Sequence, residues 1–196
     1  MRRKKLESKK VVVSLQQKNA IILAAGESKR LGQPKALVNI KGESLIQILI
    51  KRLKKFNLNV IIVTRSDLEK DIQRLGEKVV INPKPEEGRT GSIQCGLKEI
   101  RGQDCLIVPV DRPGFSDSTL KLLLELEITA CPSKNGKGGH PVILSKKDCK
   151  KVLLSKPSIP LRDLIEPKKI EVEDEFLHLN IDYPRDLESL KNITSN

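Results

Sequence analysis

The stretch most suggestive of chemistry is a loop that follows the apolar run 20–25. It carries two glycines and three cations: Gly26, Gly32, Lys29, Arg30 and Lys35. Glycine lets backbone N–H groups approach phosphate oxygens closely, and the cations offset the negative charge of the phosphates. The loop matches neither the Walker A pattern nor the Gly-x-Gly-x-x-Gly dinucleotide pattern. From these residues alone we expect a phosphate-binding loop, with an ordinary exposed loop after a strand as the alternative.

Two aspartates have the sequence setting of metal ligands. Asp111 follows an apolar run and precedes Pro113, and Asp182 follows the apolar run 177–181. Ligands of open α/β sheets bind at the carboxyl ends of strands, where a carboxylate beside cationic loops suits a Mg²⁺ ion that bridges phosphates. We therefore expect Mg²⁺ at Asp111 and, as a second ligand, at Asp182. A turn role for Asp111, and an N-cap or turn role for Asp182 or Asp186, are the alternatives.

His140 stands in the sequence Gly-Gly-His-Pro over residues 138–141. It is a candidate substrate contact. The same four residues equally suit a turn that leads into an edge strand.

The elements that must position these residues alternate along the chain from Asn19 onward. Short apolar runs with β-branched residues predict buried strands over 20–24, 60–64, 79–82, 105–110, 128–131, 140–144 and 177–181. Amphipathic stretches predict helices over 45–56, 67–75, 92–100, 119–126, 146–154 and 161–165, with a capping box between Ser66 and Glu69 at the second. A length of 196 residues suits one α/β domain with a mostly parallel sheet between two helical layers.

Composition narrows the classes of function. Only 2% of the residues are aromatic and none is Trp, which argues against the base-stacking surfaces of specific nucleic-acid binders. No apolar run is long enough to span a membrane. The four cysteines are widely spaced and only two histidines could join them, which argues against a zinc site or a disulfide framework. We expect a cytoplasmic protein without a specific nucleic-acid or membrane partner.

The net charge of +12 is unevenly distributed. Residues 1–18 hold seven basic residues and one acid, so half of the excess lies there. We expect residues 1–18 to be a basic, flexible tail and 19–196 to be the domain. A solvated arm or an upstream start codon is the favoured interpretation of the tail, and electrostatic attraction to RNA or acidic membranes is the alternative.

Residues 23–35, Leu-Ala-Ala-Gly-Glu-Ser-Lys-Arg-Leu-Gly-Gln-Pro-Lys, resemble the signature loop of the MobA-like NTP transferases. Further pieces follow in the order of that family: Gly88-x-x-x-Ser92, Asp111-Arg112-Pro113, Gly139-His140-Pro141 and residues 180–187, Asn-Ile-Asp-Tyr-Pro-Arg-Asp-Leu. The family usually has Gln where Arg112 stands. The resemblance covers residues 19–191 and lies nearest the cytidylyl branch.

This resemblance implies a single three-layer Rossmann-like domain of the nucleotide-diphospho-sugar transferase type. It also implies transfer of a nucleoside monophosphate from an NTP to the terminal phosphate of a molybdopterin-type cofactor, with release of pyrophosphate. The implied catalytic residues are Lys35 on the reacting phosphate, Arg30 on the β- and γ-phosphates and Asp111 on Mg²⁺, joined by Asp182. The implied nucleotide-binding residues are Leu23, Ala24, Ala25, Gly26, Ser28, Lys35 and Ser92.

The residues of the loop also suggest which base is used. Ala25 stands where the guanylyl branch has Gly, and its methyl group would narrow a pocket for a purine, so CTP is expected in preference to GTP. Guanylyl transfer, or nucleotidyl transfer to a sugar or alcohol phosphate, is the alternative within enzymes. A non-catalytic nucleotide or RNA-binding protein is the alternative from another class. A receiving molybdoenzyme is a further partner that the resemblance suggests.

Overall fold

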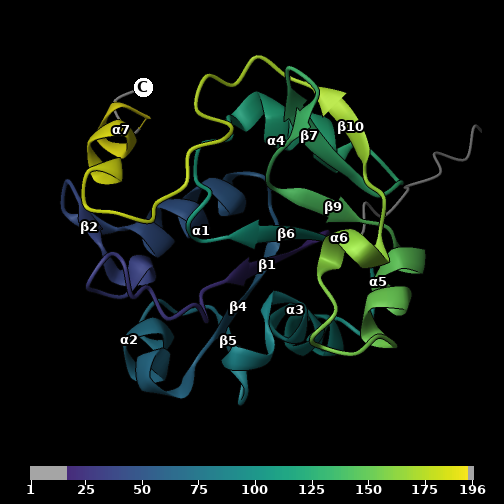
Figure 1. The fold of residues 1–196 in the computed structure, drawn as a ribbon, viewed down its shortest axis with the longest axis horizontal. Helices are drawn as coiled ribbons and strands as arrows, with labels where there is room; N and C mark the ends of the chain where they lie inside the picture. Colours follow the sequence, from purple (N-terminus) through teal and green to yellow (C-terminus); the bar gives the residue numbers. More distant parts are fainter. Residues whose placement is uncertain (1–16, 194–196) are drawn as a thin grey trace, which may run out of the picture.

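The apolar run after Lys18 forms an interior strand of the sheet, β1 (Asn19–Leu23), in which every residue is buried. The computed structural model describes residues 17–193. Strands β4 (Asn59–Thr64) and β6 (Cys105–Pro109) lie parallel on either side of β1, and β5 (Lys78–Ile81) lies parallel beyond β4. The carboxyl ends of these strands therefore meet at one edge of the sheet (Figure 1).

The other half of the sheet contains antiparallel pairs. Strand β9 (Val142–Leu144) lies antiparallel between β6 and β7 (Ala130–Lys134), and β10 (Lys168–Glu171) closes the edge parallel to β7. The full order is β10-β7-β9-β6-β1-β4-β5, with the short β8 (Lys137–Gly138) paired to β7. The prediction of a mostly parallel sheet is confirmed.

Helices cover both faces of the sheet, as expected of three layers. Alternate residues of β1 divide the core: Ala20 and Ile22 pack with α1 (Leu45–Lys55) and α4 (Asp117–Leu124), whereas Ile21 and Leu23 pack with the opposite layer. That layer contains α3 (Arg89–Glu99), α5 (Lys146–Leu153) and α6 (Leu161–Leu164) (Figure 1). The shorter elements are α2 (Glu69–Gln73), α7 (Asp186–Ile193), the β2–β3 ribbon (Asn39–Ile40, Glu43–Ser44) and the 3-10 turns Lys35–Leu37, Ser66–Leu68 and Pro85–Glu87.

Helix α3 packs very closely on strand β1. A Cβ at Gly96 would lie 2.6 Å from Ile21 Cγ2, so glycine is needed for this approach. The close contact fixes where α3 begins, at the edge of the sheet where β1 and β6 end.

One predicted strand is absent from the described residues. The segment 177–181 forms turns and irregular backbone, held by local bonds such as Leu179 N–H to the Phe176 carbonyl (2.8 Å). Leu177 and Ile181 are nevertheless buried, because the segment packs as a loop over the end of β6, where Ile181 N–H donates to the Asp111 carbonyl (2.9 Å). The apolar residues of this segment are therefore buried by a loop that packs on the sheet, and they do not form the predicted strand.

One further local prediction differs from the structure. Ser66 begins a 3-10 turn, and α2 starts after Leu68 without a side-chain cap, so the predicted capping box is wrong. At α1, by contrast, Ser44 N–H donates to Gln47 Oε1 (2.8 Å).

Of the predicted tail, residues 1–18, only residues 17 and 18 are among the described residues. Lys18 already contacts the domain, since its carbonyl accepts from Asn59 N–H (2.9 Å) and its Nζ donates to the Leu126 carbonyl (3.2 Å). Residues 1–16 of the predicted tail lie outside the described residues. Within residues 17–193, no helix has the length and apolar character needed to cross a membrane.

Candidate active site

A cavity of about 370 Å³ lies at the carboxyl edge of β1 and β6, where ligands of open α/β sheets bind. Its walls come from the loop after β1, the start of α3, the end of β6 and the segment before α7. The lining includes every predicted catalytic, nucleotide-binding and metal residue, but not His140, the candidate substrate contact: Leu23, Ala24, Ala25, Gly26, Ser28, Arg30, Lys35, Ser92, Asp111 and Asp182. The roles of these residues remain predictions.

Lys35 lies at the centre of the charged groups in this cavity. Its Nζ is 3.3 Å from Asp111 Oδ2 and 2.5 Å from Asp182 Oδ1. Arg30 Nη2 lies 3.0 Å from the other oxygen of Asp182. The side chains of Lys35, Asp111 and Asp182 are 13%, 19% and 15% exposed, so water screens their interactions only weakly. Two cations and two carboxylates, drawn from three separate parts of the chain, thus form one network.

This network sets the ionisation of Asp182. Burial raises the pKa of its carboxyl, but the hydrogen bond and charge of Lys35 and the charge of Arg30 lower it further. The net result is a pKa below the ordinary value for aspartate. Asp182 is therefore a carboxylate at neutral pH.

The loop after β1 is folded by its own side chains and by the end of β4. Ser28 has a positive φ of 55°, and its Oγ accepts a hydrogen bond from Lys35 N–H (3.1 Å), which closes the loop on itself. Arg65 Nη1 donates to the Gly26 carbonyl (2.8 Å) while its Nε pairs with Asp67. We did not predict a role for Arg65. Its position just after a parallel strand, at the same sheet edge, was the available signal.

Ser92 belongs to the first turns of α3 and is held from β5. Asn82 Nδ2 donates to Ser92 Oγ (2.9 Å), and Asn82 Oδ1 accepts from Lys84 N–H (2.9 Å). Ser92 is 5% exposed and lines the cavity, so the bond from Asn82 holds the start of α3 against the same cavity as the loop after β1.

In the segment before α7, Asp182 and Asp186 have different roles, which the sequence left open. Asp186 Oδ2 accepts from the backbone N–H groups of Asp182 (2.9 Å) and Tyr183 (2.7 Å), so Asp186 makes the turn. The Asp182 carboxylate is thereby left to face Lys35 and Arg30, and Asn180 Nδ2 supports it (2.5 Å).

His140 lies elsewhere. It lines a second cavity, of about 900 Å³, which shares Gly88 and Arg89 with the first. Burial lowers the His140 pKa to about 4, with further lowering by the positive charges of Arg89 and Arg112. Its Nδ1 is buried without a hydrogen-bond partner. The structure thus places His140 in a different cavity from the predicted nucleotide-binding residues, and Arg89, for which we predicted no role, lines both cavities.

The donor set fits the predicted Mg²⁺ ion. Mg²⁺ in phosphate-transferring sites is held by one or two carboxylates, with water and substrate phosphates completing its shell. Asp111 and Asp182 both bring a carboxylate oxygen to the Lys35 ammonium, which shows that this point favours a cation. Within residues 17–193 no group of three or more His, Cys, Asp and Glu gathers as a complete protein-only metal site.

Comparison with known proteins identifies the family. Residues 20–171 match the model of the MobA-like NTP transferase domain, so the chain belongs to the MobA-like NTP transferase family. Among curated proteins, a probable molybdenum cofactor guanylyltransferase of Bacillus anthracis is 31% identical over 108 residues, which is 54% of each chain. The chain thus spans about half the length of the curated relatives it matches.

Solved structures share the fold. The Rv0371c protein of Mycobacterium tuberculosis is 18% identical with a TM-score of 0.77, covering 90% of this chain and 97% of that one. Its complex with manganese is 16% identical with a TM-score of 0.72, covering 90% and 98%. A nucleotidyl transferase from Methanothermobacter thermautotroptrophicus is 19% identical with a TM-score of 0.75, covering 92% and 100%. At these identities the likeness establishes the three-layer α/β fold.

The bond from Arg65 to the loop after β1 predicts an effect on nucleotide affinity. Arg65→Gln removes the charged donor to the Gly26 carbonyl, so the loop loses one charge-assisted hydrogen bond. We expect the Kd for a nucleoside triphosphate, measured by calorimetry, to rise about ten-fold, the scale of such a bond. Arg74→Gln is the matched control, because Arg74 is exposed and pairs with Asp71 on α2. Equal affinities in the two variants would contradict the role of Arg65.

Proposed function

We propose that the chain transfers a nucleoside monophosphate, CMP from CTP by preference, to the terminal phosphate of a molybdopterin-type acceptor. The observation that carries this proposal is the network of Lys35 with Asp111 and Asp182 beside the glycine-containing loop. Membership of the MobA-like NTP transferase family supports nucleotidyl transfer. The curated relatives named molybdenum cofactor guanylyltransferases support this class of acceptor.

The reaction requires little acid–base chemistry from the protein. A phosphate monoester has a second pKa of about 6 and is mostly a dianion at neutral pH, so its oxygen attacks without a general base. The new bond joins this oxygen to the α-phosphorus. The bond from the α-phosphorus to the bridging oxygen breaks, and pyrophosphate leaves with the electron pair. Positioning and charge stabilisation are what the site must supply.

The side chains in the cavity are suited to these tasks. Lys35, held between two carboxylates, can reach the α-phosphate from a fixed position, since its backbone is tied to Ser28. Arg30 is 60% exposed and lies at the outer side of Asp182, where the β- and γ-phosphates of a bound triphosphate would extend. The backbone of Ala25, Gly26 and Ser28 lines the same space and would cradle the nucleotide.

Asp111 and Asp182 would hold the Mg²⁺ ion. When bound, the ion would neutralise charge on the phosphates and on the leaving pyrophosphate. The manganese complex of the Rv0371c protein supports a divalent cation at a site of this fold. Both aspartates also hold Lys35 in place, so each has a positioning role beyond metal binding.

The preference for CTP rests on Ala25. This residue is 5% exposed and lines the cavity, so its methyl group occupies space beside the bound nucleotide. A guanine base needs more room on that side than a cytosine base. Use of GTP is the second candidate, because the curated relatives are named guanylyltransferases.

Removal of Lys35 or Asp111 is expected to abolish most of the activity. Lys35→Ala and Asp111→Ala should each lower kcat at least 100-fold, the scale for losing one preorganised charge stabiliser. The measurement is pyrophosphate release with Mg²⁺, CTP and molybdenum cofactor. Lys51→Ala, at an exposed lysine that pairs with Glu43 away from the cavity, is the control. Near-normal turnover by a folded Lys35→Ala or Asp111→Ala protein would overturn the assignment.

Ala25→Gly tests the choice of base. One methyl group in a pocket is worth about 1–3 kcal/mol, so its removal should narrow the ratio of kcat/KM for CTP over GTP by roughly ten-fold. The Ala25→Gly variant need not prefer GTP over CTP for this prediction to hold. Wild-type protein that uses GTP better than CTP would refute the proposed base. A ratio that Ala25→Gly leaves unchanged would show that other residues determine it.

A further inference from the structure

Tyr183 contacts two arginines beside the nucleotide-site cavity. The guanidinium carbon of Arg30 lies 5.4 Å from the centre of the Tyr183 ring, and that of Arg185 lies 4.8 Å from the same point. Both distances are those of a cation–π contact, in which the face of the ring attracts the positive charge. Arg30 lines the cavity and Tyr183 does not, so the ring supports Arg30 from outside. Tyr183 thus joins a predicted phosphate-binding residue to a second cation.

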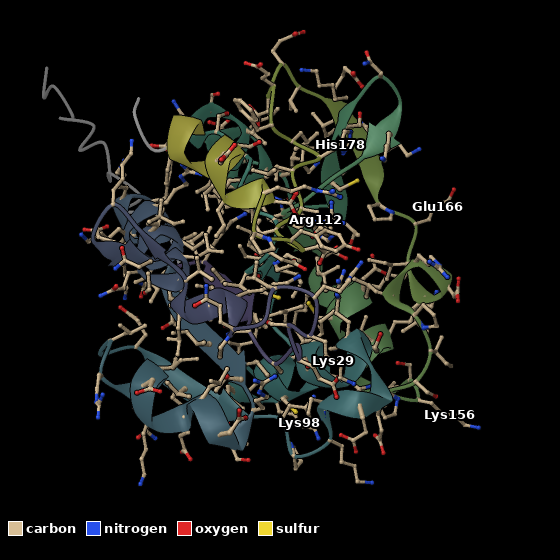
Figure 2. The ribbon with its side chains drawn as sticks, turned by 60° about the vertical axis from the view of Figure 1, so that its left-hand side comes forward. Lys29, Lys98, Arg112, Lys156, Glu166 and His178 are labelled. Atoms are coloured by element: carbon tan, nitrogen blue, oxygen red, sulfur yellow. The ribbon has the colours of Figure 1, made fainter. Side chains whose placement is uncertain are left out.

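The backbone that carries the Tyr183 ring is tied down on both sides. Tyr183 N–H donates to Asp186 Oδ2 (2.7 Å), and Asp186 N–H donates back to the Tyr183 carbonyl (3.0 Å). The segment that leads to Tyr183 is held from the end of β6, where Arg112 Nη1 donates to the His178 carbonyl (3.3 Å) (Figure 2). An aromatic ring on a backbone fixed in this way is suited to positioning another side chain.

Contact with a ring leaves the hydrogen-bond donors of Arg30 available. Arg30 Nη2 also pairs with Asp182 Oδ2 (3.0 Å), but that carboxylate is shared with Lys35 and Asn180. A guanidinium group that packs by its face keeps its N–H groups in its own plane, where they can meet an acceptor. Phosphate oxygens accept such bonds strongly. The Tyr183 ring therefore holds Arg30 without using the groups that would bind a phosphate.

Arg185 adds a second positive charge that the fold leaves uncompensated. It is exposed, and among residues 17–190 no carboxylate lies within ion-pair distance of it. Because both guanidinium groups contact one ring, the guanidinium carbons of Arg30 and Arg185 are at most about 10 Å apart. Two like charges this close repel each other, and an anion with several charged groups would offset both. The polyphosphate end of a nucleoside triphosphate is an anion of this kind.

We propose that Arg30, Tyr183 and Arg185 together bind the β- and γ-phosphates of the nucleoside triphosphate. Tyr183 is a positioning residue that acts through the two arginines, and Arg185 is a second phosphate ligand beside Arg30. The group that they recognise is a pyrophosphate unit, whether free or attached to a nucleoside monophosphate. The inference rests on the proposed function, in which Arg30 meets these phosphates, and it extends the site to two residues of the segment before α7.

The composition of the chain provides a direct reporter for this contact. The sequence has one Tyr and no Trp, so tyrosine fluorescence comes from Tyr183 alone. Inorganic pyrophosphate, which does not absorb where tyrosine does, is titrated into the full chain at constant Mg²⁺. We expect a saturable change in the Tyr183 emission, and inorganic phosphate should need at least a ten-fold higher concentration. Pyrophosphate binding seen by calorimetry without a change in emission would overturn the inference, and so would an unchanged response in Arg30→Gln.

Substitutions separate the ring from the second cation, with calorimetry as the measurement. Tyr183→Leu should raise the Kd for pyrophosphate about five-fold, the scale of one lost cation–π contact, whereas Tyr183→Phe keeps the ring and should stay within about two-fold of wild type. Arg185→Gln should raise this Kd about ten-fold. Arg101→Gln is the matched control, at an exposed arginine just beyond the far end of α3, and should change nothing. An unchanged Kd in Tyr183→Leu or in Arg185→Gln would refute the role of that residue.

Titration of CMP distinguishes loss of these contacts from general damage to the cavity. CMP lacks the β- and γ-phosphates, so its Kd should stay near the wild-type value in Tyr183→Leu and Arg185→Gln, whereas the Kd for CTP should rise as it does for pyrophosphate. Equal losses for CMP and CTP would refute the inference. A chain that shows the expected binding effects but releases no pyrophosphate from any NTP would instead fail the proposed function, so the two failures are distinguishable.

Discussion

A mostly buried ammonium group needs compensating charge, and the site is arranged around this requirement at Lys35. Its two carboxylate partners come from the end of β6 and from the segment before α7. Loss of one partner from such a network leaves an under-compensated charge in a poorly hydrated place, which is strongly unfavourable. The same ion pairs therefore bind the segment before α7 to the sheet edge and fix the position of Lys35, which we propose contacts a phosphate.

The parts of the fold and site that follow from local signals are predictable. The strands β1, β4 and β6 are short buried apolar runs, and the glycine-containing loop and Asp111 come directly after two of them. Because parallel strands end at one edge, the loop and Asp111 had to be neighbours. The edge strand β10 is highly charged and has no apolar run that would predict a strand. Leu177 and Ile181 are buried in a loop, and their apolar pattern in the sequence is like that of a buried strand.

The features of the site that the sequence did not predict depend on contacts between distant parts of the chain. Arg65 contacts the loop after β1 from the end of β4, and Arg89 lines two cavities because both meet at the start of α3. Arginine is common on protein surfaces, so residue type distinguished neither one, and the available signal for Arg65 was its position just after a parallel strand.

The most direct measurement is pyrophosphate release by the wild-type chain with Mg²⁺, each of the four common nucleoside triphosphates, and molybdenum cofactor present or absent. If the network at Lys35 serves nucleotidyl transfer to this acceptor, release will require the cofactor and will be fastest with CTP. Absence of release with every triphosphate, or release that does not depend on the cofactor, would contradict the central claim.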